Sequence, residues 1–369
     1  MSKRNKKRLT RRQQEIRRKR LKKRRRRRRL VIILELIILC ILGTTAFGLF
    51  KLGKMERTNL SNIKNNGLKQ TGYTNVALFG LDSREKNLGK GNRTDTIMIA
   101  SINNETKKVK LVSVYRDTML KQNGEHYDKA NAAYSVGGPE TAVNMLNENL
   151  DLNIQDYVSV NFLAVADVVD LLGGIDLDLT DEEVVHMNNY CVETSKVTGK
   201  KYKKIEPAVA GTYKLNGVQA VSYARIRYTA GGDYKRTERQ RLVLKKTADK
   251  LKQQDLATLN KIIDKVMPEV STSFTTKEIL SLATGAFDYE LGETTGFPFD
   301  LETPEQIPGY SGSYVIPKGL EENVIKLHQF LYPNKDYTPT ATVTDISNTL
   351  NDMTNVYPNT TESGTSQNE

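Results

Sequence analysis

The topology of this chain is constrained most strongly by an apolar segment near its amino terminus, at residues 30–50. These 21 residues contain one charged side chain, Glu35. A helix of that length rises about 31 Å, which matches the roughly 30 Å hydrocarbon core of a bilayer. Of residues 1–29, 19 are Lys or Arg. Because basic flanks stay on the cytoplasmic side, the sequence predicts a single-pass anchor in the cell membrane, with residues 51–369 outside the cell.

Two other interpretations of this region are less favourable. A cleaved signal peptide has a shorter apolar core and a small-residue cleavage site, which residues 43–46 match weakly. The basic arm could also contact nucleic acid, and it accounts for the net charge of +13. The 319 residues after position 50 contain 37 basic and 41 acidic side chains. We therefore expect an arm that orients the chain in the membrane and contacts anionic lipid, and no nucleic-acid partner.

The sequence after the anchor alternates between strand-like and helix-like patterns. Three early runs of β-branched and apolar residues are typical of strands buried on both faces. Helical segments follow, and Asn216 and Asp233 stand where the N-caps of two helices are expected, the second extending to about Lys252. Strands mixed with helices, with no internal repeat, indicate one α/β domain, arranged as a mixed α/β/α sandwich.

Domain boundaries follow from changes in composition. Residues 1–29 form the basic cytoplasmic arm, residues 30–50 the transmembrane anchor and residues 51–73 a polar linker. Residues 74–336 form the extracellular α/β domain. Residues 337–369 are rich in Thr, Asn, Ser and Pro and are predicted to be a disordered tail.

The side chains used in nucleophilic and zinc chemistry are scarce. The chain has two cysteines, Cys40 and Cys191, and no CxxC motif. Its three histidines are far apart in the sequence. These counts argue against a structural zinc site and against enzymes built on Ser-His-Asp or Cys-His pairs.

Arginine is used sparingly after residue 57, where only eight occur, in three short segments. The planar guanidinium group binds phosphate oxygens through two parallel hydrogen bonds, which lysine does not do. The clusters therefore indicate a phosphate or pyrophosphate site, although any single arginine could equally form a structural salt bridge. The eight are Arg84, Arg93, Arg116, Arg225, Arg227, Arg236, Arg239 and Arg241.

Carboxylates accompany these arginines at the ends of the predicted strands. Asp82 closes the first strand, Asp95 opens the second, and Asp117 follows Arg116 after the third. Ligands of open α/β sheets bind at the carboxyl ends of strands, where such side chains converge. Two carboxylates beside phosphate-binding arginines suit Mg²⁺, with Mn²⁺ as an alternative ion. The other interpretation is that these aspartates form turns.

Helical phase assigns the arginines of the last segment to different faces of a predicted helix. Arg236, Arg239 and Gln240 fall on one face of the predicted helix. Arg241 lies about 140° away from that face and is expected in solvent. Asp233 serves as the helix N-cap, as a base for an attacking hydroxyl, or as both.

Seven stretches, in order along the chain, resemble the LytR-CpsA-Psr family of cell-wall glycopolymer ligases. Each stretch is weak evidence alone, but seven in family order behind an amino-terminal anchor are specific. They are ALFGLDSRE, NRTDTIMIASIN, KVKLVSVYRDT, YDKANAAYSVGG, FLAVADVVDLLGGIDLDL, LNGVQAVSYARIR and GDYKRTERQR.

The resemblance implies a mixed α/β fold that binds Mg²⁺ and a polyprenyl-pyrophosphate-linked glycan at the outer membrane surface. The family transfers the glycan phosphate to a peptidoglycan sugar hydroxyl, attaching wall teichoic acid, capsule or a similar polymer. Asp82 and Asp95 match its metal-binding aspartates. The candidate pyrophosphate ligands are Arg93, Arg116, Arg225, Arg227, Arg236, Arg239 and Gln240, and the candidates for the chemical step are Arg116, Asp233, Arg236 and Arg239.

Three questions stay open at the level of sequence. The chain could instead be a non-catalytic membrane regulator of envelope gene expression, or a hydrolase that uses water in place of the sugar hydroxyl. The apolar residues of segments 141–146 and 163–172 either line a lipid tunnel or form plain core. The general base is not identified.

Overall fold

The computed structural model describes residues 55–83, 87–285 and 288–358. The predicted cytoplasmic arm and anchor lie outside these residues. Within the described ranges, no helix combines the length and the apolar character needed to cross a membrane.

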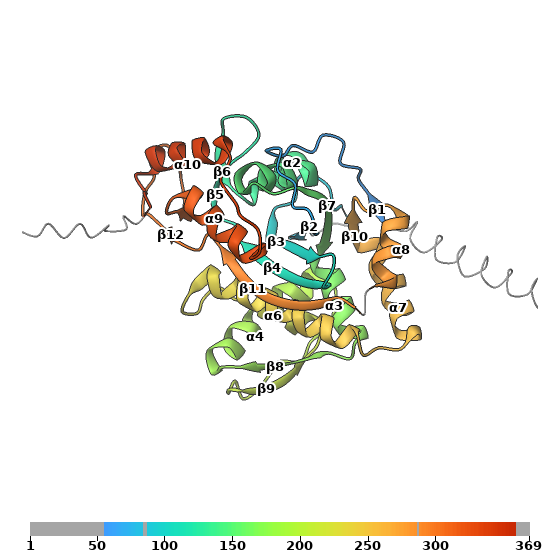
Figure 1. Ribbon diagram of the computed structural model, residues 1–369. Coiled ribbons are helices and arrows are strands. Elements are labelled where there is room, and N and C mark those ends of the chain that lie inside the picture. Colours follow the sequence, from blue (N-terminus) through green and yellow to red (C-terminus); the bar gives the residue numbers. More distant parts are fainter. Residues whose placement is uncertain (1–54, 84–86, 286–287, 359–369) are drawn as a thin grey trace, which may run out of the picture. The chain divides into compact units, whose positions relative to one another are not determined.

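A seven-stranded mixed sheet forms the centre of the described domain (Figure 1). Strands β2 and β7 are parallel to each other, as are β4 and β11, whereas β3 is antiparallel to both of its neighbours. One edge of the sheet, here called the carboxyl edge, therefore collects the ends of β2, β4, β7 and β11 and the start of β3. The strands lie in the order β1 (Glu56–Arg57), β10 (Val270–Thr272), β7 (Ile154–Asn161), β2 (Tyr73–Leu81), β3 (Thr94–Asn103), β4 (Lys108–Val114) and β11 (Glu290–Phe297).

Helices cover both faces of the sheet. The largest core lies on the face of Phe79, Ile99 and Val112, beneath helices α2 (Ala132–Leu150), α9 (Leu320–Leu331) and α10 (Ala341–Thr354). The other face packs against α3 (Phe162–Leu171), α6 (Gly232–Leu251), α7 (Leu256–Val266) and α8 (Thr276–Thr284). The α/β/α arrangement predicted from the alternation of elements is confirmed.

A smaller core lies beside the sandwich. It joins α4 (Asp181–Thr198), α5 (Gly217–Arg225) and the hairpin of β8 (Ile175–Leu179) and β9 (Gly211–Leu215). Asn216 caps α5 as predicted, because its side chain accepts a hydrogen bond from the Gln219 backbone N–H. The remaining short elements are β5 (Met119–Lys121), β6 (Tyr127–Lys129), β12 (Leu301–Glu302), β13 (Ile316–Pro317) and the 3₁₀ turn η1 (Met267–Glu269).

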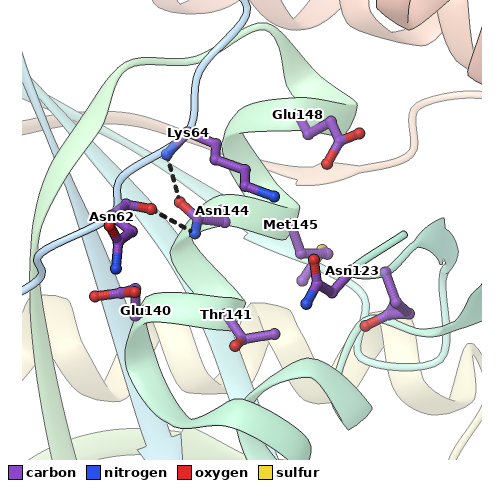
Figure 2. Close-up of a pocket in the computed structure, with 9 residues that line it drawn as sticks. Asn62, Lys64, Asn123, Glu140, Thr141, Asn144, Met145 and Glu148 are labelled. Atoms are coloured by element: carbon purple, nitrogen blue, oxygen red, sulfur yellow. Dashed lines mark hydrogen bonds between the residues drawn. The ribbon is translucent and has the colours of Figure 1, made fainter. Parts of the chain in front are cut away.

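The predicted linker is part of the folded domain from residue 55 onward. The backbone N–H of Lys64 donates to the Asn144 side chain at 2.8 Å, and Asn144 donates in turn to the Asn62 carbonyl at 3.0 Å (Figure 2). Leu60 and Ile63 pack against the main core. The seam between this segment and α2 leaves a cavity of about 210 Å³, lined by Met145 and polar side chains. The linker prediction is therefore wrong for these residues, because two apolar side chains and a series of amides fasten them to α2.

The prediction that residues 337–369 form a disordered tail is also wrong for the first half of that range. Residues 341–354 form α10, and its residues Val343, Ile346 and Leu350 are buried in the main core. Thr340 ties the start of α10 to Asp151 through its backbone N–H and its hydroxyl. The apolar residues recur at intervals of three and four, which is a helical pattern that the polar composition obscures.

Candidate active site

Five charged side chains meet at the carboxyl edge of the sheet, and we call them the arginine cluster. Asp95 is the second residue of β3, and Arg116 follows the end of β4. Arg227 lies in the segment between α5 and α6, and Asp233 and Arg236 lie in the first turns of α6. Because β3 runs opposite to β4, its start and the end of β4 reach the same edge.

Asp95 is the centre of the cluster. Its Oδ1 accepts a hydrogen bond of 2.9 Å from Arg116 Nη1, its Oδ2 lies 2.9 Å from Arg236 Nη2 in an ion pair, and Arg227 Nη2 lies 3.9 Å from Oδ1. Burial alone would raise the pKa of Asp95, but the adjacent guanidinium groups of Arg236, Arg116 and Arg227 outweigh it and hold that pKa below its usual value. Asp95 is thus held as a carboxylate.

Asp233 joins the same three arginines from the other side. Its Oδ1 lies 3.3 Å from Arg236 Nη1 and 3.5 Å from Arg227 Nε, and its Oδ2 lies 3.8 Å from Arg116 Nε. The N-cap of α6 is Gly231, at φ 86°, so the prediction that Asp233 caps this helix is wrong. A glycine takes the cap because that position needs a positive φ, which leaves the Asp233 carboxylate free to pair with arginine.

The arginine cluster carries more positive than negative charge. Three guanidinium groups face the carboxylates of Asp95 and Asp233, and Asp117, which lies 3.5 Å from Arg116, is itself paired with Lys129. Burial together with the neighbouring charges of Arg236 and Arg116 lowers the pKa of Arg227. Arg236 is 1% exposed, and its Nε has no hydrogen-bond partner among the described residues. An anion placed here would compensate the excess charge and meet donors that are already oriented.

Gln240 lies next to the cluster, as helical phase predicts. Its Nε2 donates to the Asp95 backbone carbonyl at 3.4 Å. Its Oε1 is buried and has no hydrogen-bond partner among the described residues.

Arg239 and Arg225 bind partners outside the arginine cluster. Arg239 donates to Glu183 on α4 at 2.8 Å, to the Ile226 carbonyl at 3.3 Å and to Thr229 at 2.8 Å. Arg225 pairs with Glu193 at 2.9 Å. The structure therefore separates both from Arg236, and they fasten the α5–α6 segment to α4.

The prediction that Arg241 is solvated is wrong. Its exposed fraction is 9%, and its Nη1 donates to Thr237 at 3.3 Å. Helix α6 contacts α5 on one side and strands β4 and β11 on another, so two of its faces are buried. A single-face helical pattern does not anticipate this environment.

The two predicted metal ligands leave adjacent strand ends. Leu81 pairs with Thr94 in the sheet, and the backbone N–H of Asp82 donates to the Arg93 carbonyl at 3.3 Å. Asp82 is partly buried and has no ion pair among the described residues, whereas both oxygens of Asp95 contact arginine. Within the described ranges no group of three or more His, Cys, Asp or Glu side chains is placed to hold a metal. Two carboxylates fit Mg²⁺ only when substrate oxygens and water complete its coordination.

Lys129 is a charged residue of this edge that sequence reasoning missed. The β5–β6 hairpin brings Lys129 back to the carboxyl edge. Its Nζ lies 3.1 Å from Asp117, which in turn lies 3.5 Å from Arg116. Arg93, by contrast, is exposed. No local signal distinguishes Lys129 from the other lysines, because its role depends on the hairpin.

The apolar segments considered for a lipid tunnel lie on opposite faces of the sheet. Ala142, Val143 and Leu146 of α2 are part of the main core. On α3, Val168 and Leu171 are only partly buried and pack, like Val158 and Val160 of β7, against a core on the other face. Plain core is therefore the correct interpretation for the α2 segment.

The chain is similar to known proteins in sequence and in fold. The sequence model of the LytR_cpsA_psr family matches residues 48–291. The chain is 26% identical over 337 residues to the polyisoprenyl-teichoic acid–peptidoglycan teichoic acid transferase TagV of Bacillus subtilis (strain 168), covering 82% of this chain and 78% of that protein. It is 29% identical over 253 residues to Biofilm regulatory protein A of Streptococcus mutans serotype c (strain ATCC 700610 / UA159), covering 65% and 60%.

Solved structures share the fold. TagT bound to LI-WTA superposes with a TM-score of 0.56 at 22% identity, covering 75% of this chain and 96% of that chain. The protein YwtF (TagT) with bound octaprenyl pyrophosphate lipid gives a TM-score of 0.52 at 22% identity, covering 74% and 97%.

Proposed function

The chain belongs to the LytR-CpsA-Psr family, and from this premise we propose that it is a phosphotransferase that attaches a glycopolymer to peptidoglycan. Its donor is a glycan carried on polyprenyl pyrophosphate, and its acceptor is a hydroxyl group of a peptidoglycan sugar. Relatives named as teichoic acid transferases support glycopolymer attachment. The arginine cluster around Asp95 is the observation that carries the proposal.

The cluster has the properties that phosphoryl transfer requires. That reaction asks a protein mainly to position the phosphates and to neutralise their charge. Arg116 and Arg227 have side chains that are 19% and 35% exposed, so their guanidinium groups can reach a ligand at the carboxyl edge. Arg236 is nearly inaccessible and holds both Asp95 and Asp233 in place. Arg116 and Arg227 are thus the pyrophosphate ligands, and Arg236 is a positioning residue.

The transfer needs no covalent enzyme intermediate. The acceptor hydroxyl oxygen attacks the phosphorus that carries the glycan, and the bond from that phosphorus to the bridging oxygen breaks. Polyprenyl phosphate leaves with the bridging oxygen. Asp233, whose side chain is 23% exposed, is the proposed acceptor of the hydroxyl proton. Arg116 and Arg227 stabilise the charge that develops on the phosphate oxygens.

Asp82 and Asp95 are the residues that would hold Mg²⁺, or Mn²⁺ in its place. When bound, the ion neutralises pyrophosphate charge and orients its oxygens. Asp82 has no ion pair among the described residues, and Asp95 would share its carboxylate between the ion and Arg116.

The membrane anchor complements this chemistry. We place residues 30–50 across the cell membrane, the amino terminus in the cytoplasm and the active site outside, where the substrate lipid and peptidoglycan both lie. The relative with bound octaprenyl pyrophosphate lipid supports a carrier of this class. The partly buried apolar side chains of β7 and α3 offer a surface for its prenyl chain.

A regulatory function is the second candidate, because one relative is named Biofilm regulatory protein A. The deciding experiment incubates the purified full chain with a lipid-pyrophosphate glycan, peptidoglycan and Mg²⁺. We expect a covalent glycan–peptidoglycan product together with polyprenyl phosphate. Release of free glycan phosphate alone would identify a hydrolase that uses water as acceptor, and absence of turnover would favour the regulator.

A further inference from the structure

An exposed aromatic group lies beside the arginine cluster. Tyr228, which directly follows Arg227, is 74% exposed. Its ring lies 6.4 Å from that of Tyr190, nearly parallel at 27°, and 6.2 Å from that of His186. Tyr190 and His186 are one turn apart on α4. The three rings therefore lie side by side, with Tyr228 exposed and Tyr190 and His186 partly buried beneath it.

The segment that carries Tyr228 is held in place despite this exposure. Arg239 binds it on both sides of Tyr228, at the Ile226 carbonyl and at the Thr229 hydroxyl. Arg225 lies over the Tyr190 ring, 5.7 Å from its centroid. The backbone on both sides of Tyr228 and the ring of Tyr190 are thus held before any ligand arrives, so a ligand that contacts this surface loses less free energy to ordering the protein.

We propose that Tyr228, supported by Tyr190 and His186, is the surface on which the first sugar of the donor stacks, the sugar joined to the pyrophosphate. This inference rests on the phosphotransferase function proposed above. Burial raises the pKa of Tyr190, and the charges of Arg227, Arg225 and Arg236 act against that rise. Tyr190 and the Tyr228 ring that it contacts therefore lie near the arginine cluster, where the sugar joined to a phosphate at Arg227 can reach them. A pyranose ring presents an apolar C–H face to an aromatic ring and keeps its hydroxyls at the rim, in water.

The chemistry of this surface favours a sugar over the prenyl chain. A prenyl chain gains most by complete removal from water, which a surface that is 74% exposed at Tyr228 does not provide. The rim is polar, since His186 lies 3.8 Å from Glu182 and Tyr228 carries a hydroxyl group. Aromatic faces with polar rims suit ligands that are amphipathic in the same way.

The test compares two ligands that differ only in the sugar. Binding of geranylgeranyl pyrophosphate and of N-acetylglucosaminyl geranylgeranyl pyrophosphate is measured on the full chain in detergent with Mg²⁺. We expect Tyr228→Ala to weaken binding of the sugar-bearing ligand about ten-fold and to change binding of the sugar-free ligand by less than about two-fold. Tyr228→Phe keeps the ring and should bind both ligands as the wild type does.

Tyr357→Ala is the matched control, because Tyr357 is also exposed, at 53%, but follows α10 rather than the α5–α6 segment. It should leave binding of both ligands unchanged. Equal losses for the two ligands in Tyr228→Ala, or no loss for either, would overturn the sugar surface. A wild-type chain that binds neither ligand would instead reject the proposed function, and the sugar surface with it.

Discussion

Arginines of one helix segment have different surroundings in this protein, and those surroundings decide their roles. Arg236 contacts the two aspartates of the cluster, whereas Arg239, three residues on, donates to Glu183, a carbonyl and a hydroxyl. Both are almost fully buried. Arg227, in the segment before this helix, has a side chain that is 35% exposed, so a ligand can reach it as it can reach Arg116.

The first prediction separates a ligand-binding arginine from a structural one. Arg227→Lys keeps the charge but not the planar fork, so it should weaken pyrophosphate binding about ten- to a hundred-fold with little change in stability. Arg239→Lys should instead lower the free energy of unfolding by about 1–3 kcal/mol, because it leaves Glu183 and the Ile226 carbonyl without their partners. Calorimetric titration and thermal unfolding measure the two effects. The opposite pattern would show that Arg239 holds the ligand.

A second prediction concerns the metal. Asp82 is only partly buried and has no ion pair among the described residues, so its replacement should spare the fold. We expect Asp82→Ala to unfold at the wild-type temperature and to transfer glycan about 10²–10³-fold more slowly, even in excess Mg²⁺. Initial rates with Mg²⁺ and with EDTA complete the measurement. Equal wild-type rates in the two conditions would refute the metal site.

At the scale of elements, the carboxy-terminal helices illustrate how a buried contact joins distant segments. His328 of α9 hydrogen-bonds to the Leu150 carbonyl at the end of α2, and its ring stacks on Tyr337, 3.6 Å between centroids. Tyr337 donates to Asp151 at 2.6 Å. These contacts hold α9 and the start of α10 against α2, which closes the main core on that face.

This junction predicts a dependence of stability on pH. Burial lowers the pKa of His328 from 6.5, more than the Leu150 carbonyl and Asp151 raise it. The unfolded chain therefore binds the proton more readily than the folded chain does. The contribution of His328 to the free energy of unfolding is fully present above pH 6.5 and falls as the pH drops below that value, by at most about 1.4 kcal/mol per pH unit. Thermal unfolding from pH 7.5 to 5 measures this loss.

A variant pair isolates the contribution of His328. His328→Gln retains a donor for the Leu150 carbonyl and should flatten the pH dependence. His126→Gln changes a histidine whose side chain is 68% exposed and should leave the dependence as it is. If both variants retain the wild-type slope, the loss arises from other groups.

At the scale of the whole molecule, the carboxyl edge gathers the site from distant parts of the sequence. Asp95, Arg116 and Asp233 come from three elements and meet only because the sheet places the start of β3 beside the end of β4 and packs α6 against β4 and β11. The basic arm contains 19 Lys or Arg and one acidic residue, so its positive charge exceeds the +13 of the whole chain, and the residues after position 50 have more acidic than basic side chains.

The last prediction tests orientation in the membrane. Nineteen basic residues before the apolar segment should keep that end in the cytoplasm and leave residues 51–369 outside. Protease added to intact, wall-stripped cells should then digest this portion, while a cytoplasmic protein used as a marker stays whole. Complete protection of residues 51–369 would contradict the orientation.

Sequence alone determined what depends on neighbours along the chain. The first strands, the cap at Asn216 and the end of α6 near Lys252 follow from local periodicity and capping chemistry. The structure also has the predicted grouping of arginines and aspartates at strand ends, because strand direction determines which residues lie at the carboxyl edge. Residues 341–354 also have a helical periodicity, but their polar composition predicts a disordered tail instead.

Tertiary structure decided which charges meet. Helical phase places Arg239 with Arg236 and puts Arg241 in solvent, yet Arg239 binds Glu183 and Arg241 is buried. The reason is that phase gives the direction of a side chain from its own helix, whereas its partner depends on what else packs there. Ion pairs such as Lys129–Asp117 need a hairpin to fold back before the two charges meet. Such contacts are set by packing between elements, which no local pattern encodes.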